Sequence, residues 1–120
     1  MKKSAVLKWT AHAKMKMNYY RLSPMRVRRV LHSPKRIEEG VAPKTIAMMQ
    51  PVSFKHASGR EGAAKKESWT QEIWVMIQDG PTARTVISAW RYPGVTKPRS
   101  AVAAAFMKNE YQEFVSRGGT

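Results

Sequence analysis

A few residues of this chain are of types that could carry out chemistry, and three of them are histidines. His12 stands two residues after Thr10, a plausible helix N-cap, and a histidine titrates near neutral pH. His12 is therefore our candidate for a general acid or base. The alternative is a structural histidine packed at the start of a helix. His32 is expected to cap a helix C-terminus, and His56 is expected to lie in a solvated loop.

The consecutive residues Trp90, Arg91 and Tyr92 form the second candidate site. An arginine at a strand end can bind a phosphate, and neighbouring aromatic rings can stack bases. Alternate side chains of a strand point to opposite faces, so Trp90 and Tyr92 share one face and Arg91 takes the other. We assign Arg91 and Tyr92 to catalysis and Trp90 to nucleic-acid binding. The alternative is that both aromatic rings belong to the core and Arg91 is solvated.

Two acids, Glu38 and Glu39, closely follow the basic pair Lys35 and Arg36. A carboxylate beside phosphate-binding cations can act as a general base, and we assign this role to Glu39. A surface patch of ion pairs is the commoner meaning of such a pattern. No His, Asp and Glu residues recur at the spacing of a metal site, so we expect neither a metal nor another cofactor.

The charge of the chain points to a polyanionic partner. Its 120 residues include 22 Lys and Arg against 8 Asp and Glu, which gives a net charge of +14. Residues 1–36 hold 11 of these basic residues and no acid. Such an excess predicts nucleic-acid binding through phosphate contacts. The residues expected to make these contacts are Lys14, Arg21, Arg26, Arg28, Arg29, Lys35 and Arg36.

Composition also excludes several classes of protein. The chain has no cysteine, which excludes disulfides, zinc–cysteine sites and thiol nucleophiles. No apolar run is long enough to span a membrane or to form the core of a secretion signal, so we expect a cytosolic protein. An organelle transit peptide is the alternative explanation of the acid-free start, and the compact helix signal within it disfavours that explanation.

The elements that position the candidate residues can be read from the sequence pattern. Thr10, and Ser23 followed by Pro24, are start signals for helices over residues 11–20 and 24–32. Residues 71–78 and 82–92 are typical of strands, and Asp79-Gly80 forms the turn between them.

Weaker signals complete the predicted fold. Residues 4–9 and 37–49 are strand candidates, residues 55–68 a flexible basic loop and residues 100–117 a C-terminal helix. We expect a single α+β domain over residues 1–120. Two short N-terminal helices pack on a three- to four-stranded antiparallel sheet, and a C-terminal helix follows.

The N-terminal part resembles a known family. Residues 12–17, 20–23 and 27–31 with Pro34 match a family of small toxin-like domains that opens with a His-Ala-x-x-Arg-Met helix. That family is similar to the ribonuclease superfold of barnase, colicin nucleases and RelE-type messenger-RNA interferases. The match covers residues 9–36 well and residues 71–92 in layout only. Lys14 and Lys16 stand where arginine would be commoner.

The resemblance implies metal-independent cleavage of RNA, in which a 2′-hydroxyl attacks the adjacent phosphate. An RNA substrate and an acidic inhibitory protein of the antitoxin type would be the partners. The alternative function is a non-catalytic basic protein that binds RNA or associates with the ribosome. A DNA-binding helix-turn-helix over residues 11–32 is the weakest hypothesis, because Pro24 interrupts the pair and the second helix is short.

Overall fold

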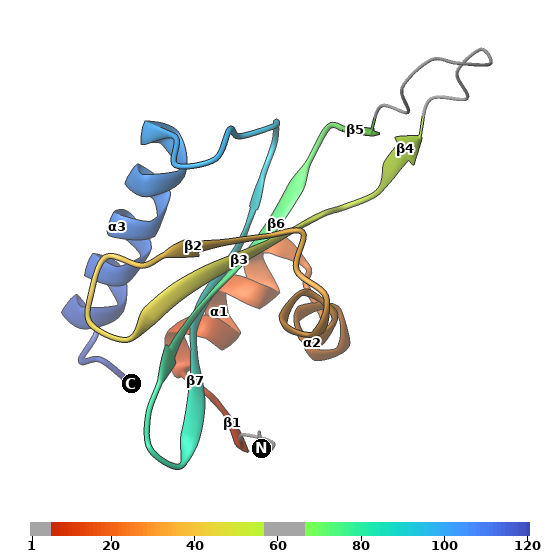
Figure 1. Cartoon of the computed structure of the whole chain (residues 1–120). Coiled ribbons are helices and arrows are strands. Elements are labelled where there is room, and N and C mark those ends of the chain that lie inside the picture. The colour runs from red at the N-terminus through yellow and green to blue at the C-terminus, as the bar shows by residue number, and fades with distance from the viewer. Residues whose placement is uncertain (1–5, 57–66) are drawn as a thin grey trace.

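The computed structural model describes residues 6–56 and 67–120, which form three helices and seven strands (Figure 1). In chain order the elements are β1 Val6–Trp9, α1 Ala11–Tyr20, α2 Pro24–His32, β2 Arg36–Glu39, β3 Thr45–Pro51, β4 Phe54–His56, β5 Glu67–Trp69, β6 Glu72–Asp79, β7 Ala83–Tyr92 and α3 Ala101–Ser116. Both predicted N-terminal helices and the C-terminal helix are present, so the α+β class is confirmed.

The main sheet has five strands in the order β1-β7-β6-β3-β2. Four of them are antiparallel to their neighbours, but β1 pairs with β7 in parallel, so the sheet is mixed and not purely antiparallel. Strands β4 and β5 form a separate hairpin that extends from the body of the sheet (Figure 1). Both flanks of the loop predicted over residues 55–68 therefore belong to strands, and residues 57–66 lie outside the described part.

Side-chain caps set the start of all three helices. The Thr10 hydroxyl accepts a hydrogen bond from the Ala13 amide at 2.9 Å and donates to the carbonyl oxygens of two β7 residues. Ser23 caps α2 in the same manner, through the amide of Arg26 at 3.0 Å. Ser100 caps α3. Thr10 thus ties the start of α1 to the sheet, and an unpaired helix amide is satisfied at each cap.

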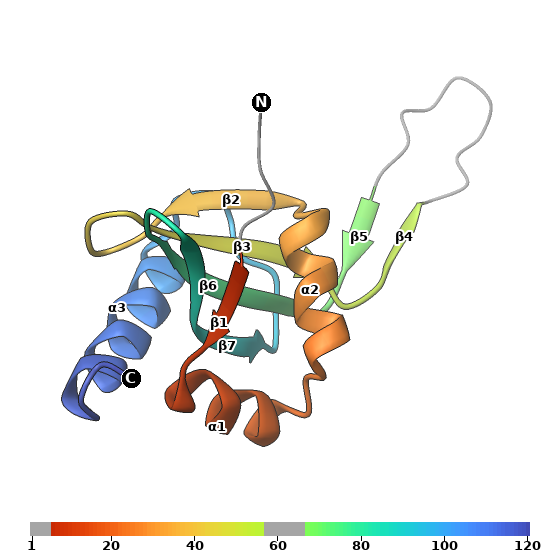
Figure 2. The same cartoon turned by 90° about the horizontal axis from the view of Figure 1, so that it is seen from below.

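The sheet separates two apolar clusters. Helices α1 and α2 pack on one face, where Ala13, Val27 and Val30 meet strand residues such as Val75. Helix α3 covers the other face, where Met107 and Phe114 pack near Trp74 (Figure 2). Strand β6 is buried from Glu72 to Ile77, as expected for a central strand covered on both faces. None of the described helices is both long and apolar enough to cross a membrane.

Candidate nucleic-acid interface

Three arginines from two elements lie near one another where α1, α2 and the end of β7 meet. Arg26 and Arg29 belong to α2, and Arg91 lies near the end of β7. The Arg26 guanidinium donates to the side-chain oxygen of Gln50 and, at 3.2 Å, to the Pro51 carbonyl. Arg91 donates to the Tyr20 carbonyl at 3.0 Å. Neutral oxygens therefore hold these two guanidinium groups in place.

The positive charge of this arginine cluster, Arg26, Arg29 and Arg91, is not neutralised locally. Partial burial lowers the pKa of Arg26, and the positive charges of Arg29 and Arg91 lower it further. Within the described parts of the chain, none of the three forms an ion pair with a carboxylate. A group of cations held by neutral acceptors can bind an anion without first breaking an ion pair.

More basic side chains extend this charge over the two N-terminal helices. Lys14, Arg21, Arg28 and Arg29 are all exposed on α1, on α2 or in the link between them. The sequence has no acid before Glu38, so neither helix carries a carboxylate. Residues of both helices pack in the same apolar cluster, so α1 and α2 and their basic residues lie on the same side of the sheet. We call this side the α1–α2 face.

Three basic side chains lie over tryptophan rings. The Arg28 guanidinium is 5.5 Å from the ring centre of Trp9, and the Lys35 ammonium is 5.8 Å from that of Trp69. The Arg36 guanidinium lies 5.8 Å from the ring of Trp74. Such cation–π contacts restrain long side chains, so Arg28 is held at the surface with its charge exposed.

Arg36, another predicted phosphate ligand, belongs to a structural network that includes a carboxylate. Its guanidinium contacts Glu38 at 3.3 Å and donates to the hydroxyl and carbonyl oxygens of Thr96 at 2.9 and 2.7 Å. The buried Glu72 carboxylate extends this network by accepting four hydrogen bonds, from Trp69, Trp74 and both the amide and hydroxyl of Thr96. The sequence alone does not single out Glu72, because an acid at a strand end looks like an ordinary surface residue.

His12, a residue of α1, is buried on the side of that helix that contacts α3. Its Nε2 lies 3.1 Å from Oε1 of Glu110, which also accepts a hydrogen bond from Ser88 at 2.6 Å. Lys16 contacts the second oxygen of Glu110 at 3.0 Å. Nδ1 of His12 has no hydrogen-bond partner among the described residues, and the whole residue is only 2% exposed. This environment favours the structural alternative for His12, since a general base must reach its substrate.

One group of potential metal ligands occurs in the described structure, and a lysine already occupies its surroundings. Donor atoms of His12, Glu110 and Glu113 lie within 4.8 Å of one another. The Lys16 ammonium lies 3.0 Å from Glu110 and 3.6 Å from Glu113. Its positive charge balances the carboxylates, so this cluster supports an ion-pair network joining α1 to α3 and does not lead us to propose a metal site.

The residues expected to carry out catalysis do not converge. His12 lies at the start of α1, whereas Arg91 binds the carbonyl of Tyr20 at the end of that helix. The eight residue steps from His12 to Tyr20 along the helix correspond to about 12 Å. Glu39 lies on β2, and the sheet order places β6 and β3 between β2 and β7, a separation of about 14 Å. Neither His12 nor Glu39 therefore lies beside Arg91.

The aromatic residues beside Arg91 lie on the opposite face of the sheet, as the alternation predicts. Trp90 is 1% exposed, with Trp74 stacked on one side at 6.1 Å and Phe106 at 6.3 Å. Tyr92 contacts Phe106 edge-on at 5.5 Å. Trp90 has no free ring face on which a base could stack, so its expected role in nucleic-acid binding is wrong and it belongs to the core. Tyr92 packs on the same aromatic group, away from Arg91, so we do not include it in the interface.

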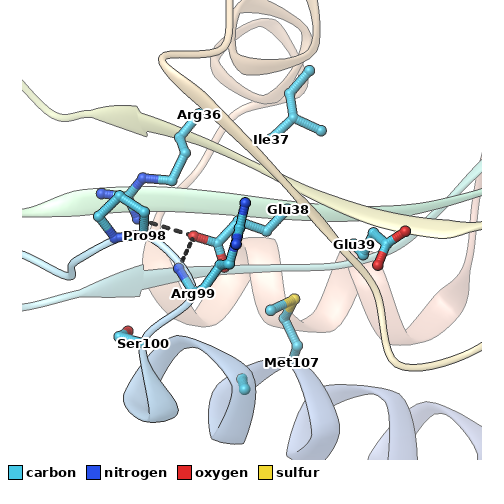
Figure 3. A pocket seen from close by; sticks show the side chains of 9 residues that line it. Arg36, Ile37, Glu38, Glu39, Pro98, Arg99, Ser100 and Met107 are labelled. Carbon is cyan, nitrogen blue, oxygen red and sulfur yellow. Dashed lines mark hydrogen bonds and ion pairs between the residues drawn. The ribbon is translucent and has the colours of Figure 1, made fainter.

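A cavity lies away from the arginine cluster, between β2 and the start of α3 (Figure 3). Its volume is about 780 Å³. Glu38 lies at its centre, where the carboxylate contacts Arg36 and accepts a hydrogen bond from the Arg99 amide at 3.0 Å. Glu39 also lines this cavity and is exposed. Opposite charges alternate here, unlike on the α1–α2 face.

Comparisons with protein families, with curated proteins and with solved structures find no match to this chain. The resemblance of residues 9–36 to toxin-like ribonucleases therefore stays a prediction.

Proposed function

We propose that this protein binds RNA through the α1–α2 face by contacts to the phosphate backbone and has no catalytic role in RNA cleavage. One observation carries the proposal. Arg26, Arg29 and Arg91 form a cluster of cations without a carboxylate partner among the described residues, on a side of the molecule whose two helices contain no acid. Arrays of this kind bind polyanions by releasing counterions.

The separation of the candidate catalytic residues supports the non-catalytic alternative over the endoribonuclease. Cleavage needs a base for the 2′-hydroxyl, an acid for the leaving oxygen and cations at the same phosphate. The only buried histidine that could supply the proton transfer among the described residues, His12, contacts Glu110 and lies at the other end of α1 from Arg91. The cations are thus available for binding, while the candidate acid–base groups His12 and Glu39 lie elsewhere in the described structure.

Charge reversal on matched surfaces tests the proposal. Arg29→Glu changes an exposed cation on the α1–α2 face, and Lys108→Glu makes the same change in net charge on α3. We expect Arg29→Glu to weaken binding of a labelled single-stranded RNA at least tenfold and Lys108→Glu to weaken it far less. Equal losses in the two variants would show that binding follows net charge and has no defined face.

An RNA-cleavage assay separates binding from catalysis. Labelled RNA incubated with an excess of wild-type protein in the presence of EDTA is expected to stay intact while it is bound. Fragments ending in 2′,3′-cyclic phosphate, lost in the variant His12→Ala, would instead support the endoribonuclease. Competition with DNA of the same sequence measures whether the interface distinguishes RNA from DNA, because both carry the phosphates that it would contact.

A further inference from the structure

Strand β2 is an edge strand of the main sheet, and its outer side has no partner strand in the described structure. The amide of Gly40 donates to the Thr45 carbonyl at 2.8 Å. This bond shows which peptide groups of β2 face β3. Peptide groups alternate in direction along an antiparallel strand. Those of Arg36 and Glu38 therefore face β3, and those of Ile37 and Glu39 point away from the sheet.

The cavity beside β2 runs along this outer edge. All four residues of β2 line it, although alternate side chains of a strand point to opposite faces. A cavity that touches all four must therefore follow the backbone. Its opposite wall is formed by Pro98, Arg99 and Ala104 (Figure 3). Ile37 is 55% exposed in the middle of the strand.

The order of charges along this edge is complementary to itself. Residues 35–39 read Lys-Arg-Ile-Glu-Glu. If a second copy of this segment runs antiparallel and Ile37 lies opposite Ile37, then Arg36 faces Glu38 of the other copy. Lys35 precedes the strand, and its amide bonds the Met49 carbonyl of β3 at 2.8 Å, so the complementary charges within β2 are those of Arg36 and Glu38. Opposite charges on facing residues stabilise a strand pair, whereas like charges destabilise it.

We propose that β2 pairs with β2 of a second copy, so that two chains form a symmetric dimer with one continuous sheet. The register centred on Ile37 is compatible with the hydrogen-bonding pattern, because the outward peptide groups of the two Ile37 residues bond each other. A two-fold axis perpendicular to the sheet keeps corresponding faces together. The two α1–α2 faces then lie on the same side of the dimer.

Side-chain positions agree with this pairing. Arg36 and Glu38 lie opposite Met49 and Ala47 of β3, which belong to the cluster under α3, so both charges are on the same face of the sheet. Glu38 uses only Oε2 for its contacts among the described residues, which leaves Oε1 for an arginine of the second copy. Charged residues on a short edge strand often prevent it from pairing with another strand. They do so when like charges face each other, whereas here Arg36 of one copy would face Glu38 of the other.

The first test measures the mass of the protein in solution. Sedimentation of the wild-type chain is expected to show a species of twice 13.6 kDa that dissociates on dilution and at high salt. Ile37→Pro removes an outward amide donor without touching the β2–β3 ladder, and it is expected to give single chains at every concentration. Val6→Lys, on the other edge strand, is the control and should keep the dimer.

Crosslinking tests the register. The chain has no cysteine, and facing residues in a hydrogen-bonded antiparallel pair are about 5.5 Å apart, a distance that a disulfide can span. Ile37→Cys is therefore expected to form a covalent dimer rapidly under mild oxidation. Val95→Cys, at a residue 54% exposed, is the matched control and should crosslink slowly. A wild-type protein that stays a single chain at the highest concentration reached, or equal crosslinking of both variants, would overturn the proposal.

Discussion

His12 and Glu110 are 98 positions apart in the sequence, and their side chains meet in the interior with 3.1 Å between Nε2 and Oε1. Ser88 and Lys16 contact the same carboxylate, so Glu110 joins α1, β7 and α3. We therefore expect its main contribution to be to stability and to the orientation of the two helices.

Removing this carboxylate should destabilise the fold strongly. Glu110→Ala leaves the buried polar groups of His12 and Ser88 without an acceptor and takes the main ion-pair partner from Lys16. Breaking one side of a buried pair costs about 3–5 kcal/mol, measured as the free energy of unfolding in urea. Glu113→Ala is the control, because that side chain is 52% exposed. A decrease in stability of similar size in both variants would contradict this account.

Stability should fall in alkaline solution. Burial acts to lower the pKa of Lys16, but the hydrogen bond from Lys16 to Glu110 and the nearby negative charges outweigh it, so the pKa is raised. The pKa of Tyr20 is also raised, mainly by burial. A group whose pKa is higher in the folded state stabilises the fold fully below its unfolded pKa and loses this effect as the pH rises through the folded one.

The corresponding pH window begins near the ordinary pKa values of tyrosine and lysine, about 10 to 10.4. Urea unfolding followed from pH 8 to about pH 11.5 should thus show constant stability at first and a decline above about pH 10. The double variant Lys16→Met with Tyr20→Phe should show a shallower decline. An identical decline in the variant would assign the effect to other groups.

Replacing Glu72 should destabilise the fold about as much as replacing Glu110, for a different reason. Its carboxylate is fully buried and accepts four hydrogen bonds from neutral donors. In Glu72→Gln one oxygen becomes an NH₂ group, so two donors lose their acceptor, at about 1–3 kcal/mol each. Because two of the donors are the indole N–H groups of Trp69 and Trp74, near-UV circular dichroism should change together with the melting temperature. An unchanged spectrum with full stability would argue against this network.

RNA affinity should depend steeply on salt concentration. Removing one phosphate contact reduces the slope of log K against log salt by about 0.7 for a single strand. Arg29→Ala should therefore reduce the slope by about 0.7 and weaken binding to all sequences alike. A slope that is the same in wild type and variant would remove Arg29 from the interface, and a wild-type slope near zero would contradict phosphate binding altogether.

Local signals in the sequence determined the helices. Thr10 before α1 and Ser23 with Pro24 before α2 predict both starts, because a cap depends only on a residue and the three that follow it. The basic character of α1 and α2 was equally visible, since charge is a property of composition. The spacing of His12, Met15 and Tyr19 at positions i, i+3 and i+7, which would place all three on one helical face, shows the limit of such patterns. Met15 and Tyr19 are 37% and 74% exposed, and Ala13 and Met17 are buried instead.

Tertiary structure decided which residues meet. The parallel pairing of β1 with β7 joins Val6 to Ala83, and no local pattern specifies a partner so distant in sequence. The same holds for His12 with Glu110 and for Arg26 with Arg91. Alternation along β7 predicted that Trp90 and Arg91 face opposite sides, but the rings that cover Trp90 come from β6 and α3. Sites made from several elements depend on packing, because burial and partners are fixed only when the sheet and helices come together.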